Sequence, residues 1–190
     1  MPQAHHANAH GHPLGRLATG AALGLMAGLA LPHARKAVMQ GPSLAAGDWM
    51  QALKAEHRMV EKSMEALLKT GEHETAKREM LLAKIAYALT KHAIEEENVV
   101  YPALVEGGHA EAAKRLIDDH GEVKTYIYDL RRLSAKDPAW VVEARKLSAA
   151  LHAHVHEEEN SLFPTFRDEI GQEENMRLTR MMNWEGFKVA

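Results

Sequence analysis

Thirteen histidines stand out in this chain of 190 residues, which contains no cysteine. Imidazole is the commonest protein ligand for metals, whereas a chain without cysteine has no thiolate sites, disulfides or thiol redox chemistry. Two histidines open the sequence His-x-x-x-Glu, one from His92 to Glu96 and one from His154 to Glu158. Residues four apart lie on the same face of a helix. The pattern therefore predicts metal ligands carried by helices.

The two pairs belong to a longer internal repeat. HAIEEENVVYP, which starts at His92, matches HVHEEENSLFP, which starts at His154. A single histidine with a valine three residues later precedes each pair: His57 with Val60, and His120 with Val123. The chain thus looks like a duplicated helical hairpin. This duplication predicts a near-symmetric dinuclear site, in which each glutamate bridges both ions and each ion binds two histidines.

The elements that carry these residues are expected to be helices. Hydrophobic residues make up 46% of the chain and aromatic residues only 5%, a mix that favours helix over sheet. Breakers divide the apolar pattern into four predicted helices, at about 48–71, 74–106, 109–134 and 138–171. Pro102 and Pro164 fall late in the second and fourth, where they should kink or end the last turns. Short loops make neighbours antiparallel, so the predicted fold class is all-α, an up-down-up-down four-helix bundle.

Polar residues interrupt the apolar stripe of each predicted helix, at positions that should face the core. They are His57, His92, Glu96, His120, His154 and Glu158. His152 and His156 fall on the opposite face, where we expect them to be solvent-exposed. In an antiparallel hairpin, residues equidistant from the turn lie at the same height, and the midpoints between successive core histidines fall at the predicted turns. The six residues should therefore meet at one level of the core.

A metal explains why such residues would be buried together. Burial of an uncompensated carboxylate has a desolvation free energy of several kcal/mol. A metal removes that cost, because it binds deprotonated carboxylates and neutral imidazoles. The alternative is a metal-free network of His–Glu hydrogen bonds. Four histidines, two of them in His-x-x-x-Glu pairs, favour the metal.

At these residues the chain resembles the hemerythrin-like family, or HHE cation-binding domains, over about residues 48–170. The order of single and paired histidines carries the resemblance, as does the Glu-Glu-x-x-x-aromatic-Pro in each repeat. It implies two non-haem iron ions held by the six residues above and bridged by Glu96 and Glu158. Iron rests on the resemblance alone, because imidazole and carboxylate also suit Mn and Zn.

Two other positions bear on this site. Oxygen-carrying hemerythrins supply a fifth histidine where this chain has Lys124, so we expect a more open centre. Glu61, one turn beyond His57, is a candidate extra ligand, although a solvated glutamate is the simpler interpretation.

The expected function is binding or sensing of dioxygen, or of a relative such as nitric oxide, at a di-iron centre. A di-iron oxidoreductase acting on peroxide, oxygen or nitric oxide is the second interpretation, and a metal-buffering or structural module is the third. Whether the protein is an enzyme stays open. Ferritin-like sites need Glu-x-x-His on two helices, but the chain has it only at Glu106–His109, in a predicted turn. The net charge of −3, without a basic stripe, gives no case for nucleic-acid binding.

Residues 1–47 differ from the bundle at 48–170. A histidine-rich tail comes first and reads as disordered, followed by an apolar segment at 17–31. Its glycines are four apart, a spacing that lets two helices approach closely: Gly20, Gly24 and Gly28. This segment could associate with a membrane or with its own copy, or it could be a poorly ordered appendage. It is shorter than the ~20 residues of a usual membrane span. We expect a cytoplasmic protein, with or without membrane association, and a C-terminal tail at 171–190 with a short capping helix.

Overall fold

The computed structural model describes Gly41 and residues 45–189, and the predicted histidine-rich tail and apolar segment lie outside them. All regular secondary structure in the described part is helical, which confirms the all-α class. Among residues 45–189, no helix is both long and apolar enough to cross a membrane.

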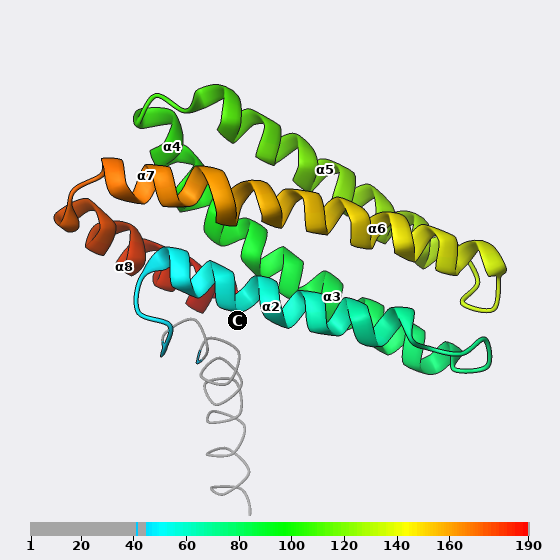
Figure 1. Cartoon of the computed structure of the whole chain (residues 1–190). Helices are drawn as coiled ribbons and strands as arrows, with labels where there is room; N and C mark the ends of the chain where they lie inside the picture. The colour runs from blue at the N-terminus through cyan, green and yellow to red at the C-terminus, as the bar shows by residue number, and fades with distance from the viewer. Residues whose placement is uncertain (1–40, 42–44, 190) are drawn as a thin grey trace, which may run out of the picture. The chain divides into compact units, whose positions relative to one another are not determined.

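Four long helices lie side by side and form the bundle (Figure 1). They are α2 (Trp49–Leu68), α3 (Thr75–Glu95), α5 (Ala110–Arg132) and α6 (Pro138–Glu157). α2 and α3 pack as one hairpin, and α5 and α6 as the other. Local sequence sets where helices begin: the Asp48 side chain caps α2 by accepting from Gln51 N, and Asp137 caps α6 by accepting from Ala139 N.

The second and fourth predicted helices each contain one wider, π-helical turn. These turns are η1 (Glu96–Val100) and η2 (Glu158–Leu162), followed by α4 (Tyr101–Glu106) and α7 (Phe163–Glu169). The Tyr101 N–H donates to the carbonyl of Glu96, five residues back, and Phe163 does the same to Glu158. Proline follows each aromatic residue; it lacks an N–H and crowds the carbonyl four residues earlier. The prolines thus widen the turn before them and do not end the helix there.

Two apolar clusters fill the two ends of the bundle. One contains Trp49 and Phe163, and the other contains Trp140. The predicted metal ligands lie between them: in α2, His57 comes after Leu53 of the first cluster and before Val60 of the second. Close packing on both sides fixes the height of the ligand side chains.

A further helix, α8 (Gln172–Val189), covers the end of the bundle that holds the first cluster (Figure 1). Its Leu178 and Met182 are fully buried in that cluster. The indole N–H of Trp49 donates to Asn175 Oδ1 at 2.9 Å, and its backbone N–H donates to Thr179 Oγ1 at 3.0 Å. The sequence predicts a short helix over about 173–184, and the helix in the structure continues beyond it.

Candidate metal centre

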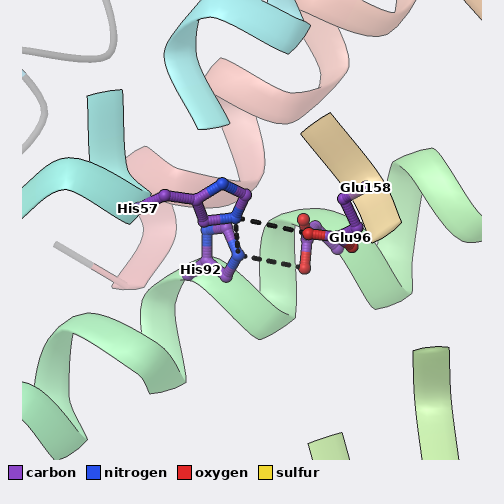
Figure 2. A group of neighbouring side chains, drawn as sticks. All are labelled: His57, His92, Glu96 and Glu158. Carbon is purple, nitrogen blue, oxygen red and sulfur yellow. Dashed lines mark hydrogen bonds and ion pairs between the residues drawn. The ribbon is translucent and has the colours of Figure 1, made fainter. Parts of the chain in front are cut away.

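The structure brings all six predicted ligand residues into one buried cluster between the helices. α2, α3, α5 and α6 contribute one histidine each, and η1 and η2 begin with the two glutamates. Exposed fractions do not exceed 5% for any of them: His57, His92, Glu96, His120, His154 and Glu158. Figure 2 shows His57 and His92 facing Glu96 and Glu158.

Four of these residues make a first metal position. One donor atom from each of His57, His92, Glu96 and Glu158 lies within 4.8 Å of the other three. His57 Nε2 is 3.0 Å from His92 Nε2 and 3.3 Å from Glu158 Oε2, and His92 Nε2 is 3.1 Å from Glu96 Oε2 (Figure 2). Imidazole nitrogens about 2.1 Å from one ion and at right angles to each other are about 3 Å apart. The spacing fits one ion.

A second metal position lies beside the first and uses the other hairpin. Glu96, His120 and His154 offer donor atoms within 4.8 Å of one another. His120 Nε2 is 3.2 Å from both His154 Nε2 and Glu96 Oε2. Glu158 Oε2 lies 3.3 Å from His154 Nε2, so it also borders this position. Each glutamate faces histidines of both hairpins, which is the placement a bridging carboxylate needs.

Two carboxylate oxygens make the case for a cation. Glu96 Oε1 and Glu158 Oε2 are buried and accept no hydrogen bond from the described residues, although Glu158 Oε2 lies 3.3 Å from two imidazole nitrogens. A buried acceptor without a donor is destabilising, more so when it is charged. A cation would satisfy both oxygens, and imidazole with carboxylate is a donor set that iron, manganese and zinc accept.

The outward ring nitrogen of each histidine faces a further carboxylate. His57 Nδ1 is 2.8 Å from Glu159 Oε1, and His120 Nδ1 is 2.9 Å from Glu97 Oε1. An imidazole that donates its Nδ1–H to a carboxylate presents an unprotonated Nε2 to a metal, in a fixed orientation. Both contacts cross between the hairpins and so join α2 to η2 and η1 to α5.

The other two histidines have their outer carboxylates on the neighbouring helix of their own hairpin. His92 Nδ1 is 3.2 Å from Glu56 Oε2, and His154 Nδ1 is 3.5 Å from Asp119 Oδ2. None of these four carboxylates was among the residues predicted from the sequence. The repeat contains the signal for them, because an acidic residue precedes each single histidine and follows each ligand glutamate.

The Tyr101 hydroxyl closes the cluster on the side of the first apolar cluster, and it too was missed. It lies 2.8 Å from Glu158 Oε1, 3.0 Å from Glu96 Oε2 and 3.2 Å from His120 Nε2. Burial and the two carboxylates raise the pKa of Tyr101 well above its ordinary value, so the phenol keeps its proton. The repeat has Phe163 at this position, which makes the hydroxyl a feature of one half only.

The histidines and glutamates compensate each other's charge when no metal is bound. Burial lowers the pKa of His92, but Glu96 and Glu56 outweigh it, and the pKa lies well above its ordinary value. Burial raises the pKa of Glu96, but His92 and His120 outweigh it, and that pKa lies well below its ordinary value. The metal-free cluster is therefore a network of paired histidines and glutamates. A metal has to displace its protons.

The remaining polar candidates lie outside the cluster. His152 and His156 are exposed on α6. Glu61 is half-buried, and its carboxylate lies 3.4 Å from His152 Nδ1. Lys124 is exposed and donates to Glu97 Oε1 at 2.9 Å, so it supports an outer carboxylate and contacts no ligand residue directly.

An apolar cavity of about 60 Å³ adjoins the cluster on the side away from Tyr101. All four ligand histidines line it. Most other wall residues are apolar and belong to the second apolar cluster or lie beside it: Val60, Met64, Leu89, Val123, Ile127 and Leu151.

Parts of this chain are similar to known proteins and to a protein family. A hemerythrin HHE cation binding domain-containing protein from Mycobacterium kansasii has a similar structure, with a TM-score of 0.65 and 21% identity over 75% of this chain and 86% of that one. A protein named DNA nickase from Nostoc sp. is 29% identical over 86 residues, or 45% of this chain, and the match spans only 24% of that relative's length. Residues 50–166, more than half of the chain, match the Hemerythrin HHE cation binding domain. The chain therefore belongs to the hemerythrin HHE cation-binding domain family.

Proposed function

We propose that the protein binds dioxygen, or a related small molecule such as nitric oxide, at a pair of non-haem iron ions. The ligands would be His57, His92, Glu96, His120, His154 and Glu158. The observation that carries the proposal is the apolar cavity that opens onto the four imidazoles. A cavity of about 60 Å³ is several times larger than the ~10–15 Å³ that a single water needs, and far smaller than the ~150 Å³ of an apolar cavity that accepts benzene. Its size and apolar walls favour a small apolar ligand.

The chain's own residues prepare the site for such a ligand. The iron pair, when bound, supplies the electrons that an oxidising ligand takes up. The outer carboxylates orient the imidazoles so that their Nε2 atoms face the metal positions. The apolar wall keeps water away from the side of the centre that the ligand reaches. Tyr101 fills the opposite side and leaves the cavity as the open face.

A di-iron oxidoreductase acting on peroxide, oxygen or nitric oxide is the second candidate. The observation that favours it is the Tyr101 hydroxyl, which keeps its proton within 3.2 Å of three ligand residues. Proton transfer by a positioned side chain is a common contribution to the turnover of a bound substrate, and the hydroxyl is close enough to the ligand residues for it. Steady-state turnover of peroxide that falls in Tyr101→Phe, with iron content unchanged, would favour this candidate over simple binding.

The name of the Nostoc relative does not transfer to this chain. The match covers about a quarter of that protein, and the net charge of −3 gives no electrostatic support for binding DNA.

The electronic spectrum of the iron-loaded protein tests the proposal. The protein is reduced without oxygen and then exposed to it, and we expect a new visible band that requires both iron and oxygen. Leu151→Phe, which adds volume to the cavity wall, should slow the appearance of the band without lowering iron content. His156→Ala, at an exposed position of the same helix that does not line the cavity, is the matched control. A full iron complement with no oxygen-dependent band would favour a metal-buffering or structural module.

A further inference from the structure

A buried lysine stands directly before the ligand His92. Lys91 is 5% exposed, and its ammonium donates to Glu56 Oε1 at 2.5 Å and to Glu95 Oε1 at 2.7 Å. Glu56 is 5% exposed and Glu95 is fully buried. Burying an ammonium requires such partners, because the desolvation penalty of an unpaired ion is several kcal/mol or more. Lys91, Glu56 and Glu95, here called the lysine triad, are thus a built feature of the interior.

The lysine triad is connected to the metal centre through Glu56. One Glu56 oxygen accepts from Lys91, and the other lies 3.2 Å from His92 Nδ1. Because both oxygens are engaged, the carboxylate cannot turn away from the imidazole. The triad therefore fixes the His92 ring in the orientation that points Nε2 at the first metal position. Whether or not Glu95 is ionised, the triad has no net positive charge that would repel an ion there.

The second half of the repeat lacks this brace. The residues aligned with Lys91, Glu56 and Glu95 are Ala153, Asp119 and Glu157. The Asp119 side chain is 42% exposed and lies 3.5 Å from His154 Nδ1. This ring nitrogen makes no hydrogen bond to any of the described residues. Glu157 pairs with Arg115 at the surface instead. His154 is therefore held less firmly than its counterpart His92.

The number of available donor atoms also favours the first metal position over the second. At the first position the donor atoms of two glutamates and two histidines all lie within 4.8 Å of one another. At the second position this holds for one glutamate and two histidines, and Glu158 borders the position through His154 alone, at 3.3 Å. A position with more donors, held in place before the ion arrives, binds with a smaller loss of conformational entropy.

We propose that the two metal positions are unequal and fill in order, with the lysine triad as the device that sets the order. The position at His57 and His92 takes the first ion and holds it tightly. The position at His120 and His154 takes the second ion and exchanges it readily. Lys91 and Glu95 are positioning residues, since they act on the ion through Glu56 and His92. The inference rests on the metal centre of the proposed function, but not on iron or on oxygen chemistry.

Titration of the metal-free full chain with Co²⁺, followed by its visible absorption, tests the order. Two binding events are expected, with the first tighter than the second. His92→Ala should abolish the tight event and keep the weak one, and His154→Ala should do the reverse. Two events of equal affinity, or a tight event that survives in His92→Ala and disappears in His154→Ala, would overturn the proposal.

A double variant tests the triad itself. Lys91→Met with Glu95→Gln removes one positive and one negative charge, and it takes away the ammonium that holds Glu56 beside His92. The first event should weaken by on the order of tenfold or more, the usual effect of losing an outer partner, and the second should not change. An unchanged first event would overturn the role of the triad. The comparison of His92→Ala with His154→Ala does not need this variant to fold.

Arg115→Met with Glu157→Gln is the matched control, because it removes the aligned charge pair at the surface of the second half. Neither binding event should change in it. The result is separable from the proposed function: unequal Co²⁺ events without an oxygen-dependent iron band would refute only oxygen binding. An oxygen-dependent band with equal events would refute only the order of filling.

Discussion

Glu96 and Glu158 connect the two halves of the centre through single side chains. Glu96 comes from the first hairpin and lies 3.2 Å from His120 of the second, while Glu158 comes from the second and lies 3.3 Å from His57 of the first. Each carboxylate is thus shared between the two metal positions. Loss of one glutamate should weaken both positions, whereas loss of one histidine should weaken mainly its own.

Replacement of Glu158 by alanine should therefore reduce bound metal from two ions per chain to at most one, because a ligand and a bridge disappear together. Metal analysis after dialysis against excess iron measures this. His156→Ala, two residues away on the exposed face of α6, should keep its full complement. If His156→Ala lost as much metal as Glu158→Ala, the assignment of ligands on this helix would be wrong.

Residue types and helical spacing were enough to predict which six polar side chains meet in the core. The outer residues were harder to predict, because Glu56, Lys91 and Glu95 are charged residues next to ligands and look like a solvated helix edge. Their burial depends on packing between α2 and α3, which one helix's pattern does not contain. Tyr101 was missed for a related reason: an aromatic residue at a core position needs no polar role.

The shifted pKa values of the cluster predict a pH dependence for the metal-free protein. The pKa values of His57, His92 and His120 lie above their ordinary value of 6.5 in the folded state, because their carboxylate partners outweigh burial. Their contribution to stability is fully present below pH 6.5 and is lost as the pH rises through the folded-state values. The pKa of Glu96 is lowered, so its contribution is present above 4.5 and is lost as the pH falls through its folded-state value.

The melting temperature of the metal-free protein should therefore fall as the pH rises above 6.5. The melting temperature of the metal-loaded protein should fall less over the same pH range, since its imidazoles are already neutral. Thermal melts by circular dichroism, with and without chelator, measure both curves. Parallel curves in the two states would contradict the charge pairing described here.

At the scale of elements, the two π-helical turns decide where the ligand glutamates point. Each turn contains one more residue than an α-helical turn, and it starts at the glutamate and ends before the aromatic residue. The aromatic residue therefore faces back toward its glutamate. In the first half this brings the Tyr101 hydroxyl to 3.0 Å from Glu96.

Replacement of Pro102 by alanine tests this element. Pro102 is exposed and follows Tyr101, so the variant removes no core side chain. The segment could then continue as a regular α-helix with every residue between Glu96 and Tyr101 kept, which turns Tyr101 away from Glu96 around the helix axis. We expect less bound metal and a lower melting temperature. Val105→Ala, exposed on α4, is the control and should change neither quantity much. A Pro102→Ala variant that kept both ions and the original melting temperature would show that the proline is not what makes the turn wide.

Local signals made the extents of the long helices predictable, because Asp48, Gly71 and Pro138 act on the backbone beside them. The wide turns were not predictable in the same way. Proline signals a disturbed turn, but a widened turn and a helix end look alike until packing decides between them. The full length of α8 also depends on tertiary contacts, since Leu178 and Met182 are buried only where the first apolar cluster meets them.

At the scale of the whole molecule, the metal centre is a cross-link between two similar hairpins. Each hairpin supplies the two histidines of one metal position and sends one glutamate toward the other position. Two outer contacts, from Glu159 to His57 and from Glu97 to His120, also cross between the hairpins. Metal binding should consequently stabilise the association of the hairpins, and so the whole bundle.

The size of that effect follows from mass action. Free metal at about 100 times its dissociation constant stabilises a one-site protein by about 2.7 kcal/mol if the unfolded chain does not bind it. For a chain of this length, about 2–4 °C of melting temperature corresponds to 1 kcal/mol, so chelation should lower the melting temperature by about 5–10 °C for each position loaded to this extent. His154→Ala should show a smaller shift, because one position remains, and a variant lacking both His92 and His154 should show almost none. Equal melting temperatures with and without chelator in the unmodified protein would mean that the imidazolium–carboxylate pairs hold the hairpins together as firmly as the metal does.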